Sequence, residues 1–227
     1  AMVLHEPALA WRFCDRVLVF HPGDWHAAAE TYRDWVSDWY KPVHSQDKPW
    51  FRQAAWIRSH ITSASIARQI AHTPPLYDAA NRRWRLAEFL AADQALLGCD
   101  PDLIHFYVWA FDESRPGDQA RNGDYGGPDY DNLGGLDSFR KALAELRGPL
   151  HKPVSLYTIW DRYTPGTEFH RQFGDRPARV TAGGQRLASE DMITISPGVP
   201  AWRTYARQTL RRLQRETAAD ILYLDVF

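Results

Sequence analysis

The apolar positions of the chain form short runs that alternate with segments of helical spacing. Uninterrupted apolar runs predict four strands, one within residues 51–60 and the others at residues 103–111, 153–160 and 221–227. Large apolar side chains recur at helical spacing over residues 83–97, 138–147 and 200–217, which predicts three helices. Strands that alternate with helices are typical of a parallel sheet with right-handed crossovers. The chain is therefore predicted to have an α/β fold.

The connections between these elements are unequal in length. The segments that follow the first three strands are long, at residues 61–82, 112–136 and 161–199, whereas each helix returns to the next strand within about 3–5 residues. This asymmetry is typical of a (β/α)₈ TIM barrel, whose functional site lies at the carboxyl ends of its strands. No GxGxxG or GxxxxGK[ST] motif follows a strand, which argues against a nucleotide-binding doubly wound sheet. We predict that residues 50–227 form the N-terminal half of a barrel, with about four strand–helix units.

The first 49 residues have a different pattern. Short strand-like pieces predict that residues 1–22 are the tail of an N-terminal β-rich domain, and residues 23–49 are predicted to be a linking helix and connector. Asp24 is a suitable N-cap for this helix, and the aromatic residues that follow it recur at helical spacing. We expect this aromatic face to pack against a core or a neighbouring domain, as we also expect for the last helix; the residues concerned are Trp25, Trp35, Trp39 and Trp202.

The last apolar run contains one carboxylate, Asp225, near its C-terminal end. In open α/β sheets and in barrels, chemistry takes place beyond the carboxyl ends of buried parallel strands, so Asp225 is a candidate catalytic residue. A domain rarely ends on a strand whose outer edge is unpaired. We therefore expect the chain to be a fragment, with the C-terminal half of the same domain following Phe227.

Other polar and aromatic residues follow the predicted strands and are expected to share the rim with Asp225. The set comprises His60, Trp109, Asp112, Glu113, Trp160, Asp161 and Arg162. Carboxylates can serve as nucleophile and acid in glycoside hydrolysis, and indole faces can stack on the apolar face of a sugar ring. We expect Trp109 and Trp160 to be partly exposed in a shared cleft. The alternative for each residue alone is structural: a helix cap, a salt-bridge partner or a core aromatic.

Composition excludes several classes of function. The formal net charge is −1 and no basic stripe is visible, which argues against a nucleic-acid partner. No apolar run approaches the roughly 20 residues needed to span a bilayer, so no membrane span is expected. The histidines form no HxH or HExxH pair, and GxSxG is absent, so we expect no metal site, no cofactor and no serine-hydrolase elbow. His105, inside a predicted strand, is expected to be a satisfied interior histidine.

Several stretches resemble bacterial TIM-barrel glycoside hydrolases related to the endo-α-N-acetylgalactosaminidases. The final residues, ADILYLDVF, are similar to their fourth-strand segment, in which a Tyr-x-Asp-Val stretch carries the nucleophile. Residues 23–35 are similar to the helix that links a β-sandwich to the barrel in those proteins, and residues 136–163 and 196–213 resemble regions before their third and fourth strands. The resemblance implies that Asp225 is the nucleophile and that the acid/base residue lies on a strand beyond Phe227.

These observations predict an incomplete catalytic domain of a retaining glycoside hydrolase. The expected partner is an oligosaccharide or glycoconjugate, bound by the rim residues around Asp225, and the resemblance favours an extracellular or periplasmic location. The chain alone is expected to be inactive, because the second carboxylate is missing. One alternative is a non-catalytic carbohydrate-binding or scaffold protein on a TIM-barrel fold, and another is a different barrel enzyme, such as an isomerase or a metal-dependent hydrolase.

Overall fold

The computed structural model describes most of the chain and divides it into two compact units. The described residues are 20–40, 48–60, 75–107, 109–112, 119–120, 125–189, 192–196 and 198–225. One unit comprises Leu4–Gln53 and the other contains Ala54–Phe227. The predicted β-rich tail lies almost wholly outside the described residues.

The described part of the N-terminal unit contains two helices, α1 (Trp25–Trp39) and α2 (Pro49–Gln53). The predicted cap is confirmed, because the Asp24 carboxylate accepts a hydrogen bond from the backbone N–H of His26 at 3.0 Å. The aromatic face of α1 does not pack on a core within its own unit, so that part of the prediction is wrong, whereas packing on a neighbouring domain stays a prediction. None of its side chains is buried, and Trp25 and Trp39 are 70% and 58% exposed. The rings contact one another, as Trp35 and Trp39 do at 5.2 Å, rather than a core.

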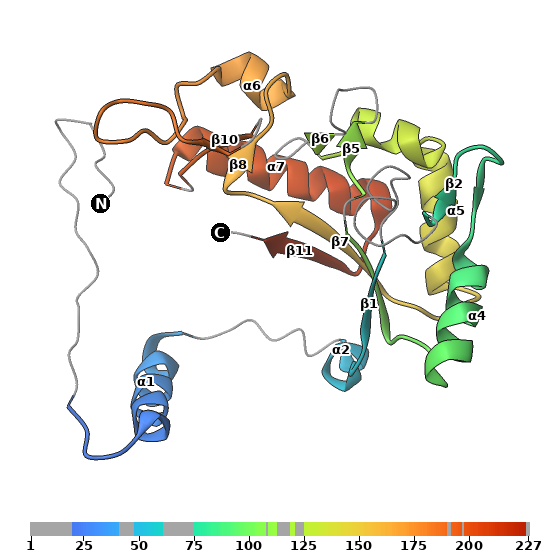
Figure 1. The fold of residues 1–227 in the computed structure, drawn as a ribbon, viewed down its shortest axis with the longest axis horizontal. Coiled ribbons are helices and arrows are strands. Elements are labelled where there is room, and N and C mark those ends of the chain that lie inside the picture. Colours follow the sequence, from blue (N-terminus) through green and yellow to red (C-terminus); the bar gives the residue numbers. More distant parts are fainter. Residues whose placement is uncertain are drawn as a thin grey trace. The chain divides into compact units, whose positions relative to one another are not determined.

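The C-terminal unit is built on a four-stranded parallel sheet in the order β1-β4-β7-β11 (Figure 1). Its strands are β1 (Ile57–His60), β4 (Leu103–Phe106), β7 (Val154–Ile159) and β11 (Ile221–Asp225). All three pairings are parallel, and the spatial order follows the chain order. This confirms the predicted α/β fold, with the strand arrangement of part of a TIM barrel.

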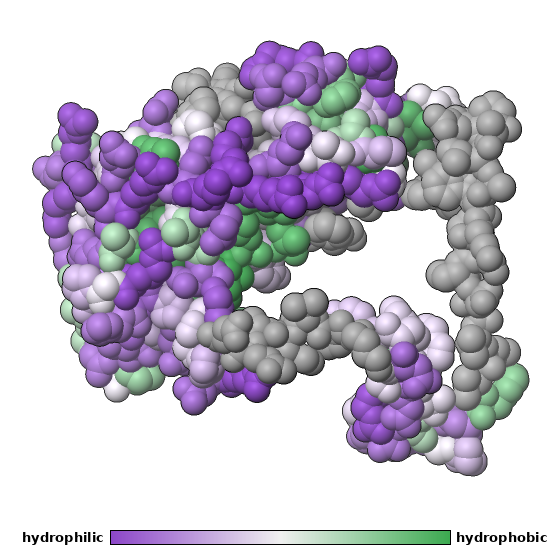
Figure 2. All heavy atoms as spheres, turned by 180° about the vertical axis from the view of Figure 1, so that it is seen from behind, coloured by the Kyte–Doolittle hydropathy of each residue, from purple (hydrophilic) through white to green (hydrophobic). Residues whose placement is uncertain are grey.

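Three helices connect successive strands: α4 (Leu86–Leu97), α5 (Leu136–Arg147) and α7 (Pro200–Thr217). They occupy the predicted helical segments, although α4 begins three residues late because residues 83 and 84 pair in a hairpin. Gly98 ends α4 in the left-handed region, at a φ of 72°, a conformation that glycine adopts without a side-chain clash. The exposed positions of α7 are mostly arginine and glutamine, and a strongly hydrophilic band crosses the surface seen in Figure 2.

The long connections after the strands contain small elements of their own. The hairpin of β2 (Tyr77–Asp78) and β3 (Arg83–Trp84) follows β1. The connection after β4 contains β5 (Phe111–Asp112), β6 (Gln119–Ala120) and the 3₁₀ helix η2 (Gly127–Leu133). The connection after β7 contains β8 (Arg162–Tyr163), α6 (Glu168–Phe173), β9 (Ala188–Ser189) and β10 (Met192–Thr194), whose strands form an antiparallel sheet in the order β8-β10-β9. Long insertions thus follow the carboxyl ends of the first three strands of the parallel sheet.

Aromatic side chains fill the core between the sheet and its helices. Phe139 of α5 is fully buried, and its ring centroid lies 5.7 Å from those of Trp84 and Phe106 and 5.8 Å from that of Trp109. Such rings bury large apolar areas and fix the helix on the strands. Phe139 therefore joins elements from the first and second strand–helix units.

Replacing Phe139 by alanine is expected to lower the free energy of unfolding of the C-terminal unit by about 3–5 kcal/mol, because it leaves a cavity among several rings. Urea titration followed by tryptophan fluorescence measures this change. Leu96→Ala is the control: Leu96 is 80% exposed, so its loss should change the free energy by less than about 0.5 kcal/mol. Equal effects of the two substitutions would contradict the proposed core.

Candidate active site

The two faces of the parallel sheet have different chemistry. In β7, Val154 and Leu156 are fully buried in the core with the helices, whereas Ser155 and Tyr157 contact side chains of neighbouring strands on the opposite face. Side chains alternate between the faces of a strand, and residues in register share a face. The opposite face, here called the inner face, therefore holds His105, Ser155, Tyr157, Tyr223 and Asp225. In a closed barrel this face lines the interior.

Asp225 lies at the carboxyl end of β11 and is held by Tyr157. The Tyr157 hydroxyl donates a hydrogen bond to Oδ2 of Asp225 at 2.5 Å. Burial raises the pKa of Tyr157, and the hydrogen bond to the carboxylate raises it further. Tyr157 is therefore a protonated donor at neutral pH. One carboxylate oxygen of Asp225 is engaged, and the described residues donate no hydrogen bond to the other.

Three tyrosine rings lie beside one another on the inner face. The Tyr157 centroid is 4.7 Å from that of Tyr107 and 5.8 Å from that of Tyr223. The rings of Tyr157 and Tyr223 are stacked, with an interplanar angle of 17°. Tyr223 is 48% exposed and Tyr107 is 37% exposed. The sequence analysis did not select these tyrosines as site residues. Counting back two positions from Asp225 would have placed Tyr223 on the same face, because side chains alternate along a strand.

His105 is satisfied in the interior, as expected. Its Nδ1 is 3.0 Å from the Ser155 hydroxyl, and its ring centroid is 5.3 Å from that of Tyr223. Burial lowers the pKa of His105. The imidazole is therefore neutral at physiological pH and contributes a polar but uncharged floor to the inner face.

The prediction that Trp109 and Trp160 are exposed in a shared cleft is wrong. They are 1% and 2% exposed, and their indole N–H groups donate to Tyr157 O at 2.9 Å and to Thr158 Oγ1 at 2.7 Å. Trp160 shares the helix-facing side with Thr158, and its ring is 5.6 Å from that of Trp202 of α7. Trp109 comes after β4 has ended at Phe106, so the strand alternation no longer applies to it. Both indoles are core residues and cannot stack on a sugar.

Asp161 and Arg162 form a bidentate ion pair at the end of β7. Arg162 donates from Nε to Oδ1 of Asp161 at 2.6 Å and from Nη2 to Oδ2 at 2.9 Å. The hydrogen bond to Asp161 raises the pKa of Arg162, and the nearby Asp225 charge contributes to the same direction. Both residues therefore lie at the predicted rim, but both oxygens of the Asp161 carboxylate are hydrogen-bonded to the guanidinium of Arg162.

The remaining predicted rim residues are only partly described. His60 is the last residue of β1 and Asp112 belongs to β5, and the side chains of both lie outside the described residues. Glu113 lies outside them altogether. The backbone positions of His60, at the end of β1, and of Asp112, in the connection after β4, agree with the strand order from which they were selected.

The connection after β4 is anchored beside Asp225 by residues that sequence analysis did not identify. The backbone N–H of Ile159, at the end of β7, donates to the buried Tyr125 hydroxyl at 2.6 Å. From α7, Arg212 donates to the carbonyl of Tyr125 at 2.6 Å, and Glu216 accepts from the Tyr130 hydroxyl at 2.8 Å. The sequence of residues 122–130, which is rich in glycine, aspartate and tyrosine, is compatible with either a substrate subsite or a turn-rich connection. In the structure, the described residues of this loop serve as an anchor.

The described part of the chain contains neither a group of metal-ligand residues nor a membrane-spanning helix. No three histidine, cysteine or acidic residues there are grouped as metal ligands would be. No helix described here is long and apolar enough to cross a bilayer.

Comparison with known proteins shows likeness in fold but not in sequence. No protein-family model and no curated protein sequence matches the chain. An α-N-acetylgalactosaminidase from Bifidobacterium bifidum in complex with GalNAc superimposes with a TM-score of 0.58 at 17% identity, over 91% of this chain and 34% of that one. A maltogenic α-amylase from Thermotoga neapolitana has a TM-score of 0.53 at 13% identity, over 75% and 39% of the two chains. An α-amylase from Lactobacillus plantarum has a TM-score of 0.52 at 16% identity, over 78% and 39%.

These solved neighbours are glycoside hydrolases, in agreement with the resemblance seen in the sequence. The chain spans little more than a third of the length of each of them. The comparisons establish a glycoside-hydrolase-like fold for the C-terminal unit.

The buried phenols provide a test of this packing. The pKa of Tyr163 is raised to about 12, chiefly by burial, and those of Tyr125, Tyr130 and Tyr157 are also raised chiefly by burial. A raised pKa in the folded state means that these phenols stabilise the fold fully below pH ~10, the value for free tyrosine, and progressively less as the pH rises above it. We expect their ultraviolet ionisation signal to appear only above pH ~10 and to coincide with a loss of stability. Full ionisation of every tyrosine near pH 10 with the fold intact would contradict the structure.

Proposed function

We propose that the C-terminal unit is the nucleophile-bearing half of a retaining glycoside hydrolase domain, with Asp225 as the nucleophile. The observation that carries the proposal is the position of Asp225, on the inner face at the carboxyl end of a parallel strand, oriented by the Tyr157 hydroxyl at 2.5 Å. In barrel enzymes, catalytic groups come from this end of the strands. The glycoside-hydrolase-like fold supports a carbohydrate substrate, either an oligosaccharide or a glycoconjugate.

The proposed chemistry requires two carboxyl groups with different tasks. The nucleophile attacks the anomeric carbon and forms a glycosyl-enzyme ester, while an acid about 5–5.5 Å away protonates the leaving oxygen and later activates water. Asp161 is poorly suited to the second task, because its two oxygens are paired with Arg162. Asp112 and Glu113 are the other candidates in the printed sequence. We propose, as the sequence resemblance implies, that the acid/base residue is supplied by a strand beyond Phe227.

Tyr157 acts in this proposal as a positioning residue. Its hydroxyl binds Oδ2 of Asp225 and leaves the other oxygen available for attack. The exposed rings of Tyr107 and Tyr223, on the same face, would provide the sugar-stacking surface that the buried tryptophans cannot. Arg162, near Asp225 and paired with Asp161, would border the same subsite.

One observation favours the non-catalytic alternative. Asp161 is the only described carboxylate at the end of the neighbouring strand β7. Its charge is paired with that of Arg162, which makes it a poor proton donor. A carbohydrate-binding protein would need the tyrosines of the inner face but no second carboxylate. Catalysis by the longer polypeptide distinguishes the two functions.

Asp225→Asn in a longer polypeptide that completes the barrel is expected to lower kcat on aryl glycosides by about 10³-fold or more, because an amide is too weak a nucleophile. A panel of aryl α- and β-glycosides measures turnover by the wild type, the variant and the present chain. The present chain alone is expected to show none. Full activity of the Asn variant would show that Asp225 is structural, and clear turnover by the present chain would place the acid/base residue within it.

Tyr157→Phe in the same polypeptide is expected to lower kcat by about 10- to 100-fold, which corresponds to the roughly 1.5–3 kcal/mol of a hydrogen bond to a charged group. KM should change little, since the ring remains in place. Tyr223→Phe is the matched control, because it removes a hydroxyl from the inner face without removing the donor to Asp225. Equal losses in the two variants would contradict the positioning role of Tyr157.

A further inference from the structure

A groove on the outer side of the C-terminal unit lies between α6 and the first turns of α7. Its volume is about 360 Å³, at the lower end of the range found for small-molecule sites. The lining is formed by Gln172, Phe173, Pro200, Ala201, Thr204, Tyr205 and Gln208. None of these residues is part of the inner face, so the groove is separate from the Asp225 site.

The floor of the groove is a rigid aromatic cluster. Phe169 of α6 is fully buried, with its ring centroid 4.7 Å from those of Trp202 and Phe173 and 5.2 Å from that of Tyr205. Trp202 is itself fixed by its indole N–H, which donates to the carbonyl of Trp160 at 2.9 Å. The half-buried rings of Phe173 and Tyr205 are therefore held in place before any ligand arrives.

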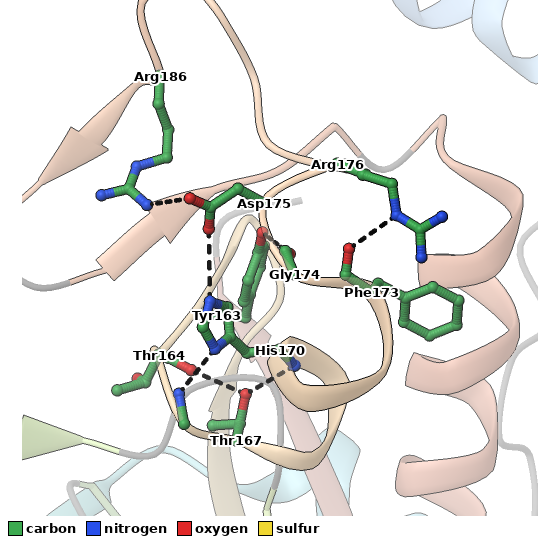
Figure 3. Close-up of polar contacts among 10 residues, drawn as sticks. Tyr163, Thr164, Thr167, His170, Phe173, Gly174, Asp175, Arg176 and Arg186 are labelled. Atoms are coloured by element: carbon green, nitrogen blue, oxygen red, sulfur yellow. Dashed lines mark hydrogen bonds and ion pairs between the residues drawn. The ribbon is translucent and has the colours of Figure 1, made fainter.

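The α6 wall is fixed at both ends by the polar contacts drawn in Figure 3. At its start, the Thr167 hydroxyl accepts from the backbone N–H of His170 at 3.3 Å. At its end, the Tyr163 hydroxyl donates to the carbonyl of Gly174 at 2.9 Å. Asp175 follows directly and contacts Nη1 of Arg186 at 2.6 Å and Nε2 of His170 at 3.4 Å. A preformed wall reduces the ordering cost of binding.

The side chains of the groove match a neutral saccharide. Every lining residue is uncharged, and the two half-buried aromatic rings are accompanied by the exposed Gln172, Thr204 and Gln208. An aromatic ring can cover the C–H face of a sugar, while amides and a hydroxyl can donate and accept hydrogen bonds with its hydroxyl groups. An anion is less suitable, because none of the residues that line the groove carries a positive charge.

The groove and Asp225 lie toward the same end of the sheet. Helix α7 is followed by β11 after only residues 218–220, so its C-terminal end is close to the start of that strand. Its first turns, which form the groove, are therefore toward the carboxyl end, where Asp225 lies. We propose that this groove is a second saccharide-binding site, which holds part of a long carbohydrate independently of the proposed catalysis at Asp225.

Native gel electrophoresis of the present chain tests this proposal with soluble starch, galactomannan or gastric mucin cast into the gel. We expect at least one of these polymers to retard the wild type, and Tyr205→Ala to remove most of the retardation. Because Tyr205 also contacts Phe169, the double variant Gln172→Ala/Gln208→Ala provides a second test that leaves the aromatic floor intact. Gln214→Ala is the matched control, since it removes an exposed amide from α7 outside the groove.

Asp225→Asn separates this proposal from the proposed catalytic function. Retardation that persists in Asp225→Asn and Gln214→Ala but is lost in the double variant supports the groove as the site, whatever the role of Asp225. Absence of retardation by all three polymers, with circular dichroism showing a folded chain, would overturn the proposal. So would retardation that is unchanged in the groove variants or lost in Asp225→Asn.

Discussion

The alternation of side chains along four parallel strands is the constraint on which the rest of the C-terminal unit depends. Each strand must place apolar residues against the helices on one face, and every second residue then points to the other face. Leu156 and Val154 meet this requirement in β7, and Tyr157 consequently lies beside Tyr223 and within reach of Asp225. The polar inner face is thus a consequence of the same register that builds the core.

Aromatic residues in the described part of the chain have different physical roles. Trp109, Trp160 and Trp202 are buried, and each satisfies its indole N–H with an oxygen of the sheet region. The tyrosines of the inner face retain partial exposure and surround a neutral histidine. The tryptophans of α1 are exposed within their own unit. High aromatic content alone therefore does not distinguish a core from a binding surface, and the direction of each side chain does.

The sequence was sufficient to predict the order of strands and helices, because long apolar runs and helical spacing are local signals. It was also sufficient to place Asp225 at a strand end. It misplaced Trp109 and Trp160, since their direction depends on where β4 stops and on which face of β7 meets the helices. The small sheet β8-β10-β9 could not be predicted, because its strands are only two or three residues long and β10 pairs with the distant β8 as well as with the neighbouring β9. The partner of Asp225, Tyr157, is 68 residues away and is revealed only by the register of β7 and β11.

Helix α7 links the two sides of the candidate site across a long stretch of sequence. Arg212 binds the carbonyl of Tyr125, 87 residues earlier, and Glu216 binds Tyr130, 86 residues earlier, while the same helix leads directly into the strand that carries Asp225. Contacts at such separations form late, because the intervening chain must first be brought together. During synthesis, the loop after β4 leaves the ribosome before α7 does. It can therefore make these contacts only after α7 has been synthesised. Helix α7 thus holds the loop after β4 and also leads into the strand that carries Asp225.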